Sequence, residues 1–200
     1  MTATFLLIRH GATGDLDVRL SGRRPGVPLS PAGEAQAAAA AQFLVDEPVD
    51  LILASPLERT RATAEAVARV VGRPVATEEA LLELDVGEWT GTDFPTLAAD
   101  PRWTHWNEER ATACCPGGET MAAAQARITG LIRRLATERD GQLIALVTHS
   151  DLIRGALCDV LGLGLAGVHR FDIDPASITR IVVGDWGGRV LSMNLVAGKS

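Results

Sequence analysis

The sequence predicts an α/β fold in which helices cover both faces of a sheet. Three short runs of consecutive apolar residues, at positions 6–8, 51–54 and 143–147, show no alternation with polar residues. Such runs are typical of strands that are buried on both sides, as in a parallel sheet flanked by helices. Longer segments with apolar residues at helical spacing separate the runs. Strands that alternate with helices along the chain indicate an α/β domain.

Length and composition bound the organisation of the chain. Two hundred residues, of which 46% are hydrophobic and 22% charged, are enough to bury a core without a disulfide or metal staple. We therefore expect one domain over residues 1–200. The formal net charge is -6, whereas most nucleic-acid-binding domains have an excess of basic residues. No nucleic-acid partner is therefore expected.

The sequence also bears on where the protein resides. No apolar run approaches the roughly 20 residues that span a bilayer, so no membrane association is expected. The apolar run at 5–8 lacks a basic leader and ends at Arg9, which favours a strand over a secretion signal. The cysteines Cys114, Cys115 and Cys158 are too few and too clustered for a disulfide framework. Reduced thiols and a cytoplasmic location are therefore expected.

Capping residues mark the starts of two helices. At Ser30-Pro31 the serine is an expected N-cap, and the proline suits the first helical position. Ser55 and Glu58 have the spacing of a capping box, which predicts that a second helix begins there. That start puts Arg59 in the first turn, where the positive end of the helix dipole disfavours a cation.

Two more helices and a hairpin are expected in the second half. A third helix follows Gly117-Gly118, and its apolar face consists of Met121, Ala124, Ile128, Leu131, Ile132 and Leu135. A fourth helix is expected from about Ser150 to Leu161, with Gly162 as its stop. The tail from 173 to 194 contains short β-like runs broken by Gly187-Gly188, which indicates a closing hairpin.

Cationic or potentially cationic side chains follow the three predicted strands. Arg9 and His10 come directly after the first run, Arg59 follows the second, and His149 follows the third. Ligands of open α/β sheets bind at the carboxyl ends of the strands, so these groups converge if the strands are parallel neighbours. Guanidinium groups suit phosphate, and an anion at a helix start is also stabilised by the helix dipole. The pattern predicts a phosphate site.

Five segments of the chain form an ordered set of motifs. They are Arg9-His10-Gly11, Ser55-Pro56-Leu57-Glu58-Arg59, Glu83 with Gly87-Glu88-Trp89-Thr90-Gly91, Pro116-Gly117-Gly118-Glu119 and Val147-Thr148-His149. Together they resemble the histidine phosphatase superfamily, which contains the cofactor-dependent phosphoglycerate mutases and many small phosphatases. The resemblance implies a three-layer α/β/α sandwich with a mostly parallel central sheet, phosphoglycerate mutase-like. It also implies phosphoryl transfer through a phosphohistidine, with no metal and no cofactor.

The resemblance assigns a role to each group. His10 matches the nucleophile, and Glu83 matches the proton donor that many members use. Arg9, Arg59 and His149 match the groups that surround the transferring phosphoryl. A neutral imidazole is a competent nucleophile at pH 7, and fixed positive charge supplies the stabilisation that dominates phosphoryl transfer. The apolar neighbours of Glu83 favour the raised pKa that an acid needs.

Several assignments stay open. Glu88 and, more weakly, Asp85 are alternative proton donors. The phosphate-binding Asn that is common in the family has no clear match, so Thr13 or the backbone around Gly22 is expected to replace that contact. Ser150 stands where a glycine is common, and we expect it to cap the fourth helix while its backbone N–H faces the anion.

A phosphatase is predicted because the phosphoglycerate mutases of this family are longer and shelter the phosphoenzyme with extra segments. Residues 93–116 have poor periodicity and are interpreted as an insertion or lid. This segment offers candidate substrate contacts, namely Arg102, Trp103, His105, Trp106 and Arg110. For the two tryptophans, plain packing is an equally good interpretation. The expected partner is a small phosphorylated substrate, and a homodimer is allowed for.

Three other functions remain open. Phosphoglycerate mutase-type transfer is the alternative within the family. His10, His149 and Glu83 could instead ligate Zn²⁺ in a metal-dependent hydrolase, although the flanking arginines would repel the metal. A non-catalytic phosphate-binding module would keep the same pocket without turnover.

Overall fold

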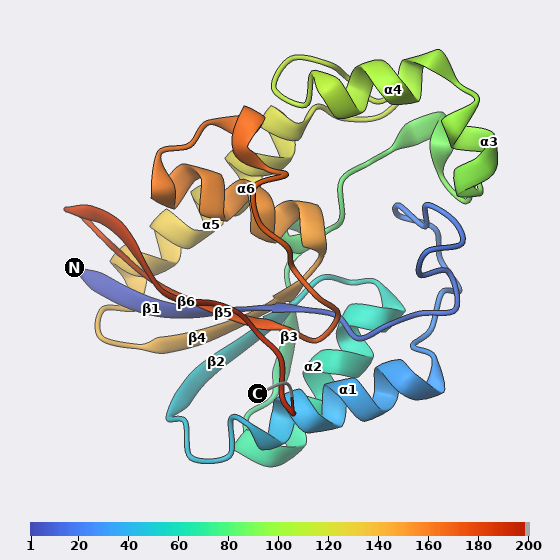
Figure 1. The fold of residues 1–200 in the computed structure, drawn as a ribbon. Coiled ribbons are helices and arrows are strands. Elements are labelled where there is room, and N and C mark those ends of the chain that lie inside the picture. Colours follow the sequence, from blue (N-terminus) through green and yellow to red (C-terminus); the bar gives the residue numbers. More distant parts are fainter. Residues whose placement is uncertain (199–200) are drawn as a thin grey trace.

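The computed structural model describes residues 1–198 and has a six-stranded sheet at its centre (Figure 1). The strands are β1 (Thr2–Arg9), β2 (Val49–Ala54), β3 (Val75–Thr77), β4 (Leu143–Thr148), β5 (Ile178–Gly184) and β6 (Gly187–Leu195). Their order across the sheet is β3-β2-β4-β1-β5-β6. The neighbours β3, β2, β4 and β1 run parallel, and β5 runs antiparallel to β1 and β6. The predicted mostly parallel sheet is confirmed.

Helices form the two outer layers. They consist of α1 (Pro31–Gln42) and α2 (Glu58–Val71), and of α5 (Met121–Glu138) and α6 (Ser150–Leu161). The short helices α3 (Phe94–Ala98) and α4 (Pro101–Glu108) lie in the 93–116 segment, and the 3₁₀ turns are η1 (Glu79–Leu81), η2 (Gly87–Trp89) and η3 (Leu165–Gly167). Helices α1 and α2 cover one face of the sheet, and α5 and α6 cover the other (Figure 1). In β1, Leu6 and Ile8 enter the core beneath α1 and α2, while Phe5 and Leu7 enter the opposite core. Burial on both faces explains why this strand is continuously apolar.

Two predicted helix ends are confirmed. The Ser30 side chain caps α1 by accepting a hydrogen bond from the Gly33 N–H, and Pro31 takes the first helical position. Helix α6 spans Ser150–Leu161 and ends at Gly162, whose φ of 64° is left-handed. Glycine adopts that conformation without the steric cost that a Cβ brings.

Two capping predictions are wrong. Helix α2 begins at Glu58, and its N-cap residue is Leu57, so Ser55 lies upstream of the helix and does not cap it. In α6 the N-cap position belongs to His149, and Ser150 is the first helical residue. Neither serine therefore caps the helix that follows it, and each lies just after the end of a strand.

The segment 93–116, interpreted as irregular, contains the short helices α3 and α4. Asp93 and Asp100 cap them by accepting hydrogen bonds from the N–H groups of Thr96 and Arg102. With five and eight residues, these helices are too short to show a repeating apolar face, which is why sequence periodicity missed them.

Trp103 and Trp106 of this segment pack against Trp89, which lies just before it, and so connect the segment to the core. The ring centroids of Trp89, Trp103 and Trp106 lie 5.3–5.8 Å apart. Trp106 is 1% exposed, and the Arg110 guanidinium lies 3.3 Å from the centre of its ring. This side chain is part of the hydrophobic core, which favours the packing interpretation of Trp106 over a substrate contact.

The tail forms the predicted hairpin, in which β5 pairs antiparallel with β6. Cys114, Cys115 and Cys158 are free thiols, and the last two are buried. Within residues 1–198, none of the helices combines the length and apolar character needed to cross a membrane.

Candidate active site

The carboxyl ends of β1 and β4 bring two imidazoles together. These strands are parallel neighbours with Arg9 paired to Thr148, and the His10 N–H donates to the Thr148 carbonyl at 3.0 Å. The residues that follow, His10 and His149, therefore lie side by side. Their ring centroids are 5.2 Å apart, with an angle of 66° between the ring planes. The convergence at one sheet edge arises directly from the parallel register.

His10 is held in the form that a nucleophile requires. Its Nδ1 lies 2.7 Å from the Gly11 carbonyl oxygen, which only accepts hydrogen bonds, so Nδ1 carries the proton and Nε2 keeps its lone pair. Burial lowers the pKa of His10 well below its ordinary value, and the positive charges of Arg59 and Arg9 lower it further. The ring is therefore neutral near pH 7, with Nε2 free to attack.

Two buried guanidiniums supply fixed positive charge beside these rings. Arg9 donates to the Ile173 carbonyl at 2.5 Å, and Arg59 donates to the Gly22 carbonyl at 2.7 Å. Arg9 Nε and Arg59 Nη1 are buried and have no hydrogen-bond partner among residues 1–198. A buried donor without a partner costs roughly 1–3 kcal/mol, so these two atoms indicate a ligand with acceptor oxygens.

His149 completes the set of donors. The ring is fully buried, and its Nε2 lies 3.0 Å from the Ser55 hydroxyl oxygen. Burial and the nearby charge of Arg59 lower the pKa of His149 well below its ordinary value, so this ring is neutral as well. When the Ser55 hydroxyl donates to Nε2, the ring proton sits on Nδ1, which has no hydrogen-bond partner within the described chain. That N–H is then free to donate to an anion.

Glu83 faces the same space from the loop between η1 and η2. Its Oε1 accepts a hydrogen bond from the Leu84 N–H at 2.9 Å, and its Oε2 lies 3.8 Å from His149 Nδ1. Burial, and after it the negative charge of Asp151, raise the pKa of Glu83 to about 7, against the smaller lowering effects of the Leu84 N–H, Arg59 and Arg9. The carboxyl group can therefore hold a proton near neutral pH and release it, as an acid catalyst must.

The rival carboxylates lie outside this arrangement. Glu88 is exposed and pairs with Arg102 at 3.1 Å. Asp85 pairs with Arg23 at 3.5 Å. Neither is placed near the imidazoles by any contact among residues 1–198, so Glu83 is the carboxylate that the fold brings to the strand ends.

The other predicted contacts are spread more widely. Gly22 orients Arg59 through its carbonyl oxygen, and Thr13 is buried in an isolated bridge with Leu29. On α4, His105 and Arg102 are exposed, and Trp103 is half-buried. Roles for these side chains in substrate binding stay predictions.

Arg110 is the one predicted lid contact that reaches a neighbour of the site. It is buried, donates to Asn107 at 3.0 Å, and pairs with Asp151 at 3.4 Å. Asp151 lies two residues after His149 in the first turn of α6. Arg110 thus connects the 93–116 segment to the charge that raises the pKa of Glu83.

Sequence reasoning missed three residues that shape the site. The local spacing predicts Ser55 as a helix cap, whereas its hydroxyl group contacts His149. Arg23 and Arg127 both donate to the main-chain carbonyl of Glu83. The family motif drew attention to Ser55 without giving its partner, and no local pattern marked the two arginines.

The alternative of a metal site built from His10, His149 and Glu83 is not supported by this arrangement. Within residues 1–198, no three His, Cys, Asp or Glu side chains are grouped so that they could hold a metal ion. The guanidiniums of Arg9 and Arg59 place positive charge beside both rings. The donor set favours an anion.

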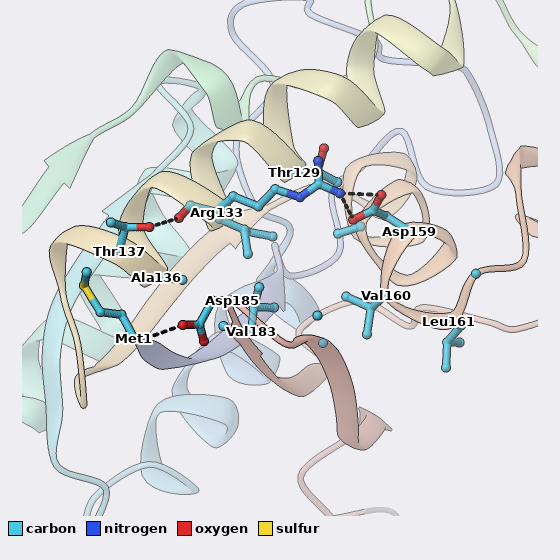
Figure 2. Close-up of a pocket in the computed structure, with 16 residues that line it drawn as sticks. Met1, Thr129, Arg133, Ala136, Thr137, Asp159, Val160, Leu161, Val183 and Asp185 are labelled. Carbon is cyan, nitrogen blue, oxygen red and sulfur yellow. Dashed lines mark hydrogen bonds and ion pairs between the residues drawn. The ribbon is translucent and has the colours of Figure 1, made fainter.

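A cavity of about 740 Å³ lies elsewhere, between α5, α6 and the β5–β6 turn (Figure 2). Its charged groups compensate each other, since Arg133 pairs with Asp159 at 2.7 Å and the Met1 amino group pairs with Asp185 at 3.2 Å. The strand ends, by contrast, retain buried donors that lack partners among the described residues. They are therefore the candidate active site.

Comparison with known proteins agrees with this geometry. The family profile described as histidine phosphatase superfamily (branch 1) matches residues 5–196. Phosphoserine phosphatase 1 of Hydrogenobacter thermophilus is 29% identical over 195 residues, which cover 95% of this chain and 91% of that protein. A solved mycobacterial glucosyl-3-phosphoglycerate phosphatase has a TM-score of 0.86 at 26% identity, covering 97% of this chain and 99% of that chain. The alpha-ribazole phosphatase of Shigella flexneri has a TM-score of 0.86 at 26% identity, with 98% and 99% covered.

The profile match extends over nearly the whole chain and includes both strand-end histidines. The solved structures share the architecture over almost their full length. The chain therefore belongs to the histidine phosphatase superfamily and is a phosphatase, a hydrolase with the phosphoglycerate mutase-like fold.

Proposed function

We propose that this protein is a metal-independent phosphomonoesterase that hydrolyses a small phosphorylated metabolite through a phosphohistidine on His10. One observation carries the proposal: a neutral imidazole with a free Nε2 lies among buried donors of Arg9, Arg59 and His149 that have no partner in the described chain. Such a set suits a tetrahedral anion, whose oxygens would accept from these donors while its phosphorus faces the lone pair.

In the first step, His10 Nε2 attacks phosphorus and the bond from phosphorus to the ester oxygen breaks. The electron pair of that bond goes to the leaving oxygen, which takes the proton of Glu83 Oε2 and departs as an alcohol. The guanidiniums of Arg9 and Arg59 stabilise the charge on the phosphoryl oxygens during transfer. The products of this step are phosphohistidine, a Glu83 carboxylate and a free alcohol.

In the second step, water attacks the phosphohistidine. Glu83 takes a proton from the water, the P–N bond breaks, and its electron pair returns to His10 Nε2. Inorganic phosphate leaves, and both side chains recover their starting forms. A group with a pKa of about 7 suits both halves of the cycle, because it can donate and accept a proton near neutral pH.

The names of the similar proteins support the substrate class without choosing a substrate. They include phosphatases named for phosphoserine, for glucosyl-3-phosphoglycerate and for alpha-ribazole. Each name points to a small metabolite, and the three differ in the group that carries the phosphate. We therefore propose a small phosphate ester of an alcohol, with residues 93–116 as the lid that selects it.

The experiment is a turnover screen of phosphorylated metabolites with the chelated enzyme, run beside an assay for phosphoglycerate isomerisation. Release of phosphate in the presence of EDTA, without isomerisation, is the expected result. Isomerisation without net hydrolysis would instead support the mutase alternative, a function named for several relatives of this chain. Phosphate binding without any turnover would support the alternative of a non-catalytic phosphate-binding module.

A further inference from the structure

Two guanidiniums converge on the main chain of the proton donor. Arg23 Nε donates to the Glu83 carbonyl oxygen at 2.8 Å, and Arg127 Nη2 donates to the same oxygen at 3.0 Å. Arg127 comes from α5 and also donates to the carbonyls of Ala80 and Leu82 at 2.9 and 2.6 Å. A carbonyl oxygen has two lone pairs, and charged donors form its stronger hydrogen bonds. The backbone at Glu83 is therefore held from two separate elements.

Glu119 connects the two arginines. Its Oε1 accepts from Arg23 Nη2 at 3.0 Å and from Arg127 Nη2 at 2.6 Å. The same oxygen accepts from the Asp85 N–H at 3.1 Å. The Glu119 side chain is 19% exposed, and that of Arg127 is 21% exposed, so solvent screens these charges only in part. One carboxylate thus orients both guanidiniums that hold Glu83.

The backbone around Glu119 is fitted to the same loop. The Glu119 N–H donates to the Asp85 carbonyl at 2.8 Å, and the Glu88 N–H donates to the Pro116 carbonyl at 2.9 Å. A Cβ at Gly118 would lie 2.2 Å from the Asp85 carbonyl oxygen, closer than any side chain permits. Only glycine allows this approach of two backbones. The turn at 116–119 therefore lies directly against the loop that carries the acid.

We propose that Glu119 is a positioning residue for proton transfer, which acts through Arg23 and Arg127 to hold Glu83 with its Oε2 toward His149. The inference rests on the proposed role of Glu83 as the acid. Glu119 bonds to the arginines and to the backbone of the loop, and Glu83 in turn has its Oε1 fixed by the Leu84 N–H. With the main chain and one carboxyl oxygen fixed, Oε2 is the oxygen left for proton transfer.

The test is a double-mutant cycle of Glu119→Gln and Glu83→Gln, with a phosphate ester of a simple alcohol and an aryl phosphate as substrates. An aryl leaving group departs without a proton, so only the alkyl substrate depends on the acid. Glu119→Gln alone is expected to lower kcat/KM for the alkyl ester by about 10- to 100-fold, the usual cost of misplacing a catalytic group. The kcat/KM of the aryl ester, which reports only the steps up to departure of the leaving group and not the later hydrolysis in which Glu83 acts as base, is expected to stay within about threefold.

Non-additivity separates positioning from a merely structural role. In the Glu83→Gln background the acid is already absent, so adding Glu119→Gln is expected to cost the alkyl ester nothing more. Fully additive losses, or equal losses on both substrates, would overturn the inference. If Glu83→Gln itself failed to distinguish the two substrates, the acid assignment would be wrong, and the inference would end with it.

Controls keep the result interpretable. Glu65→Gln is the matched variant, because Glu65 is exposed on α2 and forms a single 3.8 Å ion pair with Arg61. It is expected to match the parent on both substrates. Urea unfolding checks that each variant is folded. If Glu119→Gln does not fold, Arg127→Lys tests the same hydrogen bonds to the Glu83 carbonyl and to Glu119. A lysine keeps the positive charge but lacks the several N–H donors of the planar guanidinium group. It must reproduce the selective loss on the alkyl ester, and equal losses on both esters would again contradict the inference.

Discussion

The Glu83 carboxyl group and the His149 ring face each other, with 3.8 Å between Oε2 and Nδ1. The other carboxyl oxygen is occupied by the Leu84 N–H, and the other ring nitrogen contacts the Ser55 hydroxyl. Each residue therefore turns a single polar atom toward the space in front of His10. The predictions below follow from this arrangement of one nucleophile, one acid and a set of fixed donors.

Replacement of His10 by alanine is expected to reduce turnover of an aryl phosphate to below about a thousandth of the parent rate, because no other group supplies the nucleophile. The fold is expected to persist, since the His10 N–H bond to Thr148 belongs to the backbone. Steady-state kinetics and circular dichroism check both points. Substantial turnover in a folded His10→Ala protein would reject the nucleophile assignment.

The pH profile is expected to respond to Asp151. Glu83 is faced by positive charge from Arg9 on β1 and Arg59 on α2, and by negative charge from Asp151 on α6, which Arg110 neutralises in part. A negative neighbour disfavours the charged carboxylate, so Asp151→Asn lowers the pKa of Glu83. The alkaline limb of kcat for an alkyl ester then moves to lower pH.

The matched control for this shift is Asp159→Asn on the same helix. Asp159 pairs with Arg133 at the far end of α6 and lines the distant cavity, so its removal is expected to leave the limb in place (Figure 2). An alkaline limb that moves to higher pH in Asp151→Asn, or does not move, would contradict the electrostatic account of Glu83.

Stability is expected to depend on pH through Glu83. The pKa of this group is raised from an ordinary 4.5 to about 7 on folding. The stabilising contribution of the protonated carboxyl group to the free energy of unfolding is therefore fully present below pH 4.5 and is lost as the pH rises through 7. The loss amounts to about 3 kcal/mol. Glu83→Gln does not ionise, so urea unfolding at pH 8 is expected to show it more stable than the parent, by a margin that shrinks at pH 5. A constant margin would mean that Glu83 titrates normally.

Vanadate is expected to raise the melting temperature. A ligand that binds only the folded state at about 100 times its Kd adds about 2.7 kcal/mol, which corresponds to roughly 5–10 °C for a chain of this size. Arg59→Gln removes one of the buried donors and is expected to lose most of the shift. Chloride at equal ionic strength serves as the control. The same shift in Arg59→Gln would place the anion elsewhere.

Ser55→Ala is expected to reduce kcat by about three- to tenfold, the value of one hydrogen bond. The hydroxyl fixes which nitrogen of His149 carries the proton, so nitrogen NMR shifts of the ring should reveal a mixture of tautomers in the variant. Ser192→Ala, on β6 far along the sheet, is the matched control. An unchanged ring spectrum in Ser55→Ala would contradict this role.

The convergence of Arg9, His10 and His149 could be predicted because it depends on few facts. Each residue ends or follows a strand whose continuous apolar run indicates burial on both faces, and parallel neighbours place such ends together. The start of α1 at Ser30-Pro31 could be predicted for a similar reason. An N-cap hydrogen bond joins residues only three positions apart, so the sequence contains both partners in one short segment.

The side-chain contacts that could not be predicted join residues far apart in the sequence. The Ser55 hydroxyl matched a capping box locally, but its bond to His149 spans 94 positions in the chain. No sequence pattern singles out Arg23 and Arg127, because a carbonyl acceptor leaves no mark in the sequence. For Trp106 the sequence leaves packing and substrate contact as equal interpretations, because the helix that carries it is too short to show a pattern.

The central claim is that phosphoryl passes through His10, and quenching the reaction within its first turnover tests it most directly. Enzyme treated with EDTA is mixed with a radiolabelled aryl phosphate, stopped in alkali, and digested to locate the label. The account predicts an alkali-stable, acid-labile phosphoryl group on His10, absent in His10→Ala. Full hydrolysis with no labelled protein, or label on another residue, would contradict it.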